Sequence, residues 1–149
     1  MNSLDTNILL YATNADCDEH AQTRRLVDWA LANPKNWVMA DQVYFELYRL
    51  LRNPAVLERP RSSAEAWECL DYYRHHSGWL HCAYETPFMD QVAEILRNTE
   101  FAPRKTFDLV LAVTLKRNGV TTLYTRNTAD FEGLEWFTVV NPLGQNGDP

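Results

Sequence analysis

The sequence lacks the features of a membrane protein. No stretch approaches the roughly 18 consecutive apolar residues that a membrane-spanning helix requires, and residues 1–5 carry an acid and no basic residue, unlike a signal peptide. Cysteine is also scarce: there are three, Cys17, Cys69 and Cys82, and no pair has C-x-x-C spacing. An odd number without such spacing favours free, buried thiols in a reducing compartment. We therefore expect a cytoplasmic protein with no membrane contact.

Positive charge is in short supply as well. The chain has 14 Lys and Arg against 20 Asp and Glu, which gives a net charge of −6. Because proteins bind nucleic acids by neutralising phosphates with basic residues, this balance argues against tight binding unless cations offset clustered acids. Many basic residues fall near the middle of the chain: Arg49, Arg52, Arg59, Arg61, Arg74, Arg97, Arg104 and Lys105. They form either positive patches beside a negative pocket or an ordinary solvated surface.

The sequence does contain enough apolar material for one core. Hydrophobic residues make up 46% of the 149 positions, which suits a single domain. The sequence predicts strands at residues 2–5, 37–40, 79–82, 122–125 and 137–140. It predicts that one helix starts within residues 8–12. Further helices are predicted at residues 18–32, 41–53, 62–76, 86–98 and 106–118. This alternation is typical of a parallel sheet covered on both faces. We therefore expect an α/β fold, a three-layer sandwich around a mainly parallel five-stranded sheet.

Several helix ends carry recognisable signals. Ser62 and Glu65 have the spacing of a capping box, and Thr86 and Pro87 suit an N-cap followed by a first helical residue. Gly119 suits the position just after a helix. Residues 144–149 are polar and contain Gly and Pro, so we expect a disordered tail after a domain that spans residues 1–143.

Four acids fall where ligands bind in such sheets, beyond the carboxyl ends of the strands. Asp5 ends the first predicted strand, and Asp130 lies shortly after the fourth. Glu46 and Asp108 sit early in predicted helices, and both have apolar neighbours that would partly desolvate a carboxylate. A position in a first helical turn would explain one such acid, but not four directed at the same place.

A pocket of several carboxylates needs a counter-charge, because the acids repel one another and some would otherwise be protonated at neutral pH. Mg²⁺ and Mn²⁺ prefer oxygen ligands and would keep such a cluster ionised. Divalent ions in carboxylate sites activate water and stabilise the leaving oxygen in phosphodiester cleavage. The pattern therefore predicts Mg²⁺- or Mn²⁺-dependent hydrolysis of a phosphate ester.

Four segments of the chain resemble, in order, the motifs of PIN-domain nucleases. They are LDTNILLYA at residues 4–12, VYFEL at 43–47, FDLVLA at 107–112 and LYTRNTADF at 123–131. Size and spacing are most similar to the VapC-type toxins of prokaryotic toxin–antitoxin pairs. The resemblance implies a PIN domain over residues 1–143 and a metal-dependent endoribonuclease that acts on tRNA or ribosomal RNA. It also implies a homodimer and a cognate antitoxin protein.

The resemblance further implies roles for individual residues. Asp5, Glu46 and Asp108 are the expected catalytic acids and metal ligands, with Asp5 and Asp108 the most direct ligands. Asn127 stands where many relatives carry another Asp, so Asp130 is the expected fourth catalytic acid. Residues expected to support these acids or to contact substrate are Thr6, Asn7, Thr125, Arg126 and Asn127.

Two other functions stay open at this stage. A non-catalytic PIN module that binds RNA or protein is compatible with the Asn127 departure. A haloacid-dehalogenase-like phosphatase also begins with an Asp after its first strand, but it resembles an Asp-x-Asp pattern, and here the third residue is Asn7. A group of aromatic residues could belong to the core, stack on RNA bases or form a protein interface: Tyr44, Phe45, Tyr48, Trp67, Tyr72 and Tyr73.

Overall fold

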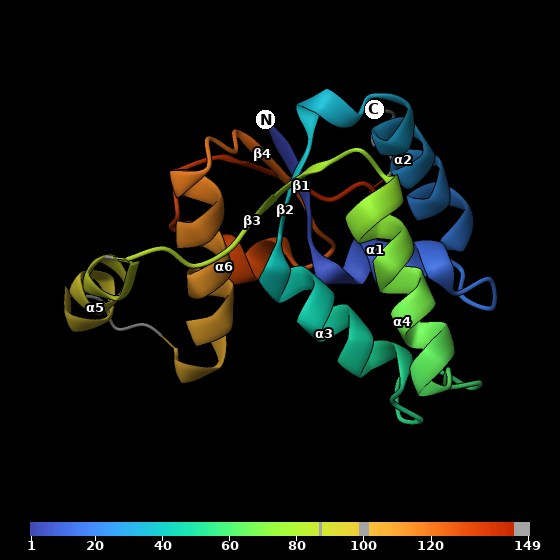
Figure 1. The fold of residues 1–149 in the computed structure, drawn as a ribbon. Coiled ribbons are helices and arrows are strands. Elements are labelled where there is room, and N and C mark those ends of the chain that lie inside the picture. Colours follow the sequence, from blue (N-terminus) through green and yellow to red (C-terminus); the bar gives the residue numbers. More distant parts are fainter. Residues whose placement is uncertain (87, 99–101, 145–149) are drawn as a thin grey trace.

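The structure is a computed structural model that describes residues 1–86, 88–98 and 102–144 (Figure 1). Its strands are β1 (Asn2–Leu4), β2 (Val38–Ala40), β3 (Leu80–Cys82), β4 (Thr122–Tyr124) and β5 (Thr138–Val140). Its α-helices are α1 (Thr6–Thr13), α2 (His20–Ala32), α3 (Asp41–Leu51), α4 (Ser63–Asp71), α5 (Phe88–Asn98) and α6 (Thr106–Arg117). Shorter helical turns are η1 (Pro34–Asn36), η2 (Tyr72–His76), η3 (Pro103–Lys105) and η4 (Thr128–Phe131).

All described strand pairs are parallel, as predicted, but the five strands do not form one continuous ladder. β4 lies between β1 and β5 in one group, and β2 pairs with β3 in another. A single parallel bridge between Asn2 and Trp37 links the two groups. The prediction of one five-stranded sheet is therefore only partly confirmed. Each strand has only three residues, which leaves few backbone groups for pairing on both sides.

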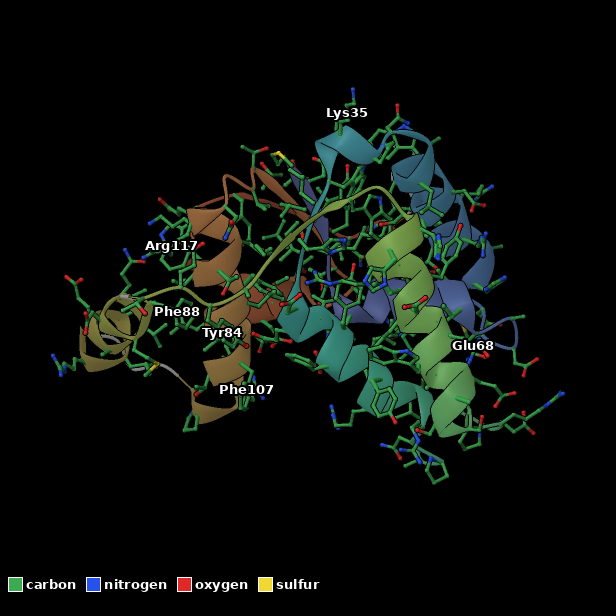
Figure 2. The ribbon with its side chains drawn as sticks, in the orientation of Figure 1. Lys35, Glu68, Tyr84, Phe88, Phe107 and Arg117 are labelled. Atoms are coloured by element: carbon green, nitrogen blue, oxygen red, sulfur yellow. The ribbon has the colours of Figure 1, made fainter. Side chains whose placement is uncertain are left out.

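Helices cover both faces of the strands, which confirms the three-layer arrangement. In Figure 1, α1, α2 and α4 lie on one side of the strands, and α5 and α6 lie on the other. Leu9 of α1 and Leu47 of α3 are fully buried, and so are Leu109 and Leu115 of α6. Charged residues such as Lys35 and Glu68 point outward (Figure 2). The apolar pattern of α6 is explained by its position against β2, α5 and η4.

The signals for helix ends are largely confirmed. Ser62 and Glu65 form both hydrogen bonds of the capping box, and α6 ends before Gly119, which has a positive φ of 72°. The helix predicted to reach residue 76 changes at Tyr72 into the π-helical turn η2. Pro87 lies outside the described residues, and so does most of the predicted tail, residues 145–149.

The three cysteines are free, as predicted. Cys82 is buried, but Cys17 and Cys69 are only partly buried, so the expectation of three buried thiols is wrong for these two. Cys17 lies in the turn before α2, where its Sγ contacts the carbonyls of Tyr11 and Asn14. Among the described helices, none is both long and apolar enough to cross a membrane.

The loop before β3 provides a test of backbone strain. A Cβ on Gly78 (φ 73°) would lie 3.1 Å from Cβ of Pro34, whereas a Cβ on Gly119 (φ 72°) would meet nothing within 4 Å. Both Gly→Ala changes force a left-handed backbone, but only the first adds a clash. We expect Gly78→Ala to lower the free energy of unfolding by about 2 kcal/mol and Gly119→Ala by about 1 kcal/mol. Urea denaturation followed by circular dichroism measures both, and equal losses would contradict this interpretation.

Candidate active site

Asp5 follows β1 directly and is held from three sides. Its backbone N–H donates to the carbonyl of Tyr124 (2.9 Å), which continues the pairing of β1 with β4. As the N-cap of α1, its Oδ1 accepts a hydrogen bond from the backbone N–H of Thr6 (2.6 Å). Its Oδ2 accepts from Asn7 Nδ2 (2.7 Å) and from Thr125 Oγ1 (2.6 Å). The carboxylate is thus fixed at the carboxyl ends of two neighbouring strands.

Asn7 joins the start of α1 to the loop after β4. Its Nδ2 also lies 3.0 Å from Thr125 Oγ1, and its Oδ1 accepts from the backbone N–H of Arg126 (3.1 Å). Thr125 Oγ1 accepts from the backbone N–H of Asn127 as well (3.0 Å). The residues expected to support Asp5 therefore form one network with it. Asn127 contributes its backbone to this network, and the residue itself is exposed.

Glu46 approaches the same place from α3. Its Oε2 accepts a hydrogen bond from Thr6 Oγ1 (2.9 Å), and its Oε1 lies 3.5 Å from Nη2 of Arg49, one turn further along the helix. Thr6 thus binds Asp5 through its backbone and Glu46 through its buried side chain. This double contact fixes two of the predicted acids relative to each other.

Asp108 lies in the first turn of α6. Its pKa is raised to about 6, first by partial burial and then by the negative charges of Asp130, Asp5 and Glu46, against the opposing effect of Lys105. A carboxyl group that is affected by three other acids lies in their common field. Asp108 is therefore within the electrostatic influence of the other three predicted acids.

Asp5 is affected in the same way. Burial raises its pKa to about 6 although the hydrogen bonds from Thr125, Thr6 and Asn7 favour the charged form, and the charge of Glu46 adds to the increase. A carboxyl with three donors would otherwise ionise easily. Its raised pKa therefore comes mainly from burial, which the three hydrogen bonds offset only in part.

Asp130 enters the site from η4. Its backbone N–H donates to the carbonyl of Asn127 (3.1 Å), and the adjacent Ala129 carbonyl accepts a hydrogen bond from Nζ of Lys105. Lys105 thereby ties the residues before α6 to the turn that carries Asp130. Sequence patterns gave no indication of this contact, because its partners are 24 positions apart.

The acids do not form a preformed metal cage. Within residues 1–86, 88–98 and 102–144, no three His, Cys, Asp or Glu side chains are close enough together to hold one ion. The assignment of Asp5, Glu46 and Asp108 as ligands of one ion therefore stays a prediction. Glu46 is turned toward Thr6 and Arg49, and mutual repulsion opposes a closer approach of the carboxylates.

The side chain of Arg126 has partners that the sequence did not reveal. Its Nη1 lies 2.7 Å from Oε1 of Glu19 and 2.9 Å from the Tyr11 hydroxyl. Both partners are more than a hundred positions away in the chain, so no local pattern could have indicated them. The contacts hold Arg126 beside the loop that carries Thr125.

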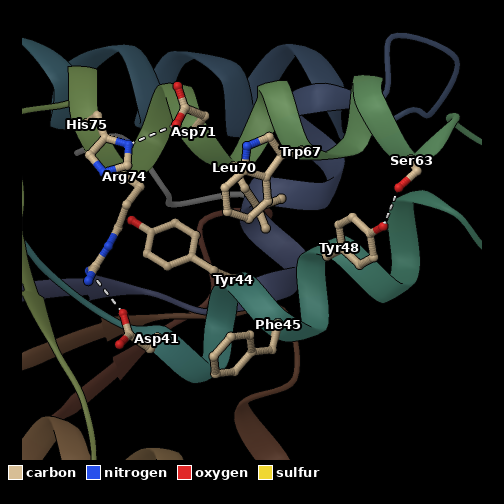
Figure 3. A pocket seen from close by; sticks show the side chains of 10 residues that line it. All are labelled: Asp41, Tyr44, Phe45, Tyr48, Ser63, Trp67, Leu70, Asp71, Arg74 and His75. Atoms are coloured by element: carbon tan, nitrogen blue, oxygen red, sulfur yellow. Dashed lines mark hydrogen bonds and ion pairs between the residues drawn. The ribbon is translucent and has the colours of Figure 1, made fainter.

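A hollow of about 510 Å³ lies between α3 and α4 (Figure 3). It is lined by Asp41, Tyr44, Phe45, Tyr48, Ser63, Trp67, Leu70, Asp71, Arg74 and His75. Tyr44 and Tyr73 are buried core residues, whereas Phe45, Trp67 and Tyr72 are largely exposed and Tyr48 is partly exposed. The aromatic residues therefore divide between the core and the surface.

Comparison with known proteins agrees with this geometry. The family model of the PIN domain matches residues 3–135. The chain is 38% identical over 148 residues to Ribonuclease VapC24 of Mycobacterium tuberculosis, covering 99% of this chain and 100% of that relative. The fold matches the crystal structure of M. tuberculosis VapC20, described as a Sarcin-Ricin loop cleaving toxin, with 17% identity, a TM-score of 0.62 and 83% and 87% of the two chains covered.

A second solved structure, VapBC2 from Rickettsia felis bound to a promoter DNA fragment, matches with 16% identity and a TM-score of 0.62 over 94% of this chain and 97% of that one. The match of the PIN-domain model to residues 3–135 of this α/β fold places the chain in the PIN class. The chain belongs to the PIN-domain family and is a homologue of the VapC ribonucleases of toxin–antitoxin systems. This membership favours a nuclease over the phosphatase alternative.

The raised pKa of Asp108 gives a testable effect on stability. A folded-state pKa of about 6 means that the folded protein holds this proton more tightly than the unfolded chain, so ionisation opposes folding as the pH rises through 6. In EDTA, we expect Asp108→Asn to be more stable than wild type by about 1 kcal/mol at about pH 7.5, a figure discounted for solvent screening.

Below about pH 4 the carboxyl is protonated in both states, so the advantage should disappear. Thermal or urea unfolding across this pH range measures the difference. Asp90→Asn, which changes an exposed carboxylate on α5, is the matched control and should show no such pattern. Equal stability of wild type and Asp108→Asn at about pH 7.5 would contradict the assignment of a desolvated, repelled carboxylate.

Proposed function

We propose that this chain is the toxin of a toxin–antitoxin pair, an endoribonuclease that hydrolyses RNA phosphodiester bonds. The observation that supports this most directly is the electrostatic coupling of Asp108 to Asp130, Asp5 and Glu46. Four carboxylates that lie near one another repel a negatively charged phosphate, so they can take part in its hydrolysis only when cations are present. The full-length similarity to a protein named as a ribonuclease also supports this proposal.

The donor set suits Mg²⁺ or Mn²⁺, with Asp5 and Asp108 as the principal ligands. Three described hydrogen bonds use three of about four acceptor positions of the Asp5 carboxylate, which leaves one on Oδ1. Asp108 accepts no hydrogen bond among the described residues. Mg²⁺ usually keeps several waters and binds through one or two carboxylates and substrate phosphates. A site without a three-residue cage therefore fits this ion.

When bound, the ion would supply a nucleophilic water at neutral pH and offset the negative charge of the phosphate. The chain's own residues then have distinct tasks. Thr125 and Asn7 orient the Asp5 carboxylate, and Thr6 fixes Glu46 relative to it. We propose that the partly exposed Glu46 carboxylate accepts the proton of the attacking water.

The proposal also includes the molecules that this protein binds. A cognate antitoxin is supported by solved neighbours described as VapBC2 and as a toxin–antitoxin complex from Klebsiella pneumoniae. We propose in addition a homodimer, a tRNA or ribosomal RNA substrate, a cytoplasmic location and a catalytic domain that spans residues 1–143. Arg126 and Asn127, at the exposed end of the Asp5 network, are proposed to contact the RNA backbone.

Cleavage tests the proposal directly. Wild type with Mg²⁺ or Mn²⁺ should cut end-labelled tRNA or ribosomal RNA, and EDTA should stop the reaction. Asp5→Asn and Asp108→Asn should reduce the cleavage rate by at least about 100-fold, because each removes charge that holds the ion, while the circular dichroism spectrum stays unchanged. Asp90→Asn should cut like wild type. Full activity of both site variants would refute the assignment, and binding without cleavage by wild type would favour the non-catalytic module.

Metal binding can be measured without any substrate. A ligand that binds only the folded state raises the unfolding temperature, so about 10 mM Mg²⁺ or Mn²⁺ should stabilise wild type against heat. Asp108→Asn should lose most of this gain, whereas Asp90→Asn should keep it. An equal gain in both variants would place the bound ion elsewhere on the protein.

A further inference from the structure

Two exposed phenylalanines adjoin the acids. Phe107 and Phe45 are the most exposed large hydrophobic side chains in the described part of the chain, at 73% and 70%. Phe45 directly precedes Glu46 on α3, and Phe107 directly precedes Asp108 on α6. Exposure of a phenyl ring to water is unfavourable, so folding alone does not account for the two rings. We propose that they stack on unpaired bases of the RNA on either side of the acids, an inference that rests on the proposed function.

The two rings belong to one edge of the site. Gln42, three residues before Phe45, donates a hydrogen bond from Nε2 to the backbone carbonyl of Phe107 (2.8 Å). The first turns of α3 and α6 are therefore in contact. Figure 2 shows Phe107 at the end of α6 where that helix begins, and Figure 3 shows Phe45 on α3 at the hollow that it lines together with Trp67.

Positive charge is interleaved with the rings. Arg49 lies one turn after Phe45, and its side chain is 66% exposed. Arg104 and Lys105 precede Phe107 in the chain. Exposed aromatics beside Arg and Lys are typical of sites for single-stranded nucleic acid, in which cations contact phosphates and rings stack on splayed bases. The arrangement therefore favours unpaired RNA over a duplex, whose stacked bases the rings could not reach.

A second copy of the chain is the alternative occupant of this edge. The core of a protein interface is depleted in charged residues. Here charged residues lie close to each ring in the sequence, Glu46 and Arg49 after Phe45 and Lys105 and Asp108 beside Phe107, and a protein partner that covers them would have to desolvate them. RNA leaves them hydrated or pairs the cations with phosphates, so the observations favour RNA.

Binding of a single-stranded RNA of about ten nucleotides that contains 2-aminopurine tests the proposal, since the fluorescence of this base reports stacking. The Asp5→Asn background keeps the RNA intact. In that background, Phe45→Ala and Phe107→Ala should each weaken binding by about 5- to 50-fold and remove the fluorescence change. Phe→Tyr at either position should restore both, whereas Phe→Leu should not. Tyr72→Ala, which removes an exposed aromatic of η2 that does not line the hollow beside Phe45, is the matched control and should bind normally.

The proposal is overturned if the oligonucleotide does not bind, if both alanine variants bind as before, or if Phe→Leu restores binding as well as Phe→Tyr. It is also overturned if light scattering shows that the alanine changes dissociate a dimer while RNA affinity is unchanged, because the rings would then lie between two copies. Failure of the proposed function looks different, since wild type would then leave RNA uncut whatever residues stand at positions 45 and 107.

Discussion

The contact on which the site depends is the hydrogen bond between Thr125 Oγ1 and Asp5 Oδ2 (2.6 Å). It joins the ends of β1 and β4, two strands that are 120 positions apart in the chain. Because those strands are parallel neighbours in register, their carboxyl ends coincide and the residues that follow them must meet. Asn7 then ties the same pair to the loop that carries Arg126 and Asn127. A binding edge at this point is what the topology of an open parallel sheet favours, since connections leave β1 and β4 in opposite directions.

This architecture explains how much of the site could be predicted from the sequence. The positions of Asp5 and Asp108 follow from local patterns, an acid at a strand end and an acid in a first helical turn. Parallel pairing then places them at one edge whatever the detailed strand order. The ends of α4 and α6 were equally predictable, because the capping box and the glycine signal act within a few residues. The inferences about these two helix ends, which rest on local chemistry, were confirmed.

The features that the sequence did not reveal depend on contacts between distant residues. The link between the two strand groups is a single bridge at Asn2, a consequence of strands too short to pair fully. The π-helical turn that begins at Tyr72 follows an otherwise regular helical pattern. The pairing of Arg126 with Glu19, and the rotation of Glu46 toward Thr6, depend on how separate helices pack. Such rotations decide whether carboxylates share an ion, so a ligand set cannot be derived from strand ends alone.

The three acids also differ in the groups that stabilise their negative charge. Asp5 at the N-cap of α1 and Asp108 in the first turn of α6 both lie at the positive end of a helix dipole, which favours negative charge. Burial outweighs this benefit, since both pKa values are raised to about 6. Glu46 lies too far along α3 to gain from a dipole and instead has Thr6 and Arg49 as partners. Asp5 and Asp108 are therefore the two acids that gain most from a bound cation, whereas Glu46 already has Thr6 and Arg49 as partners.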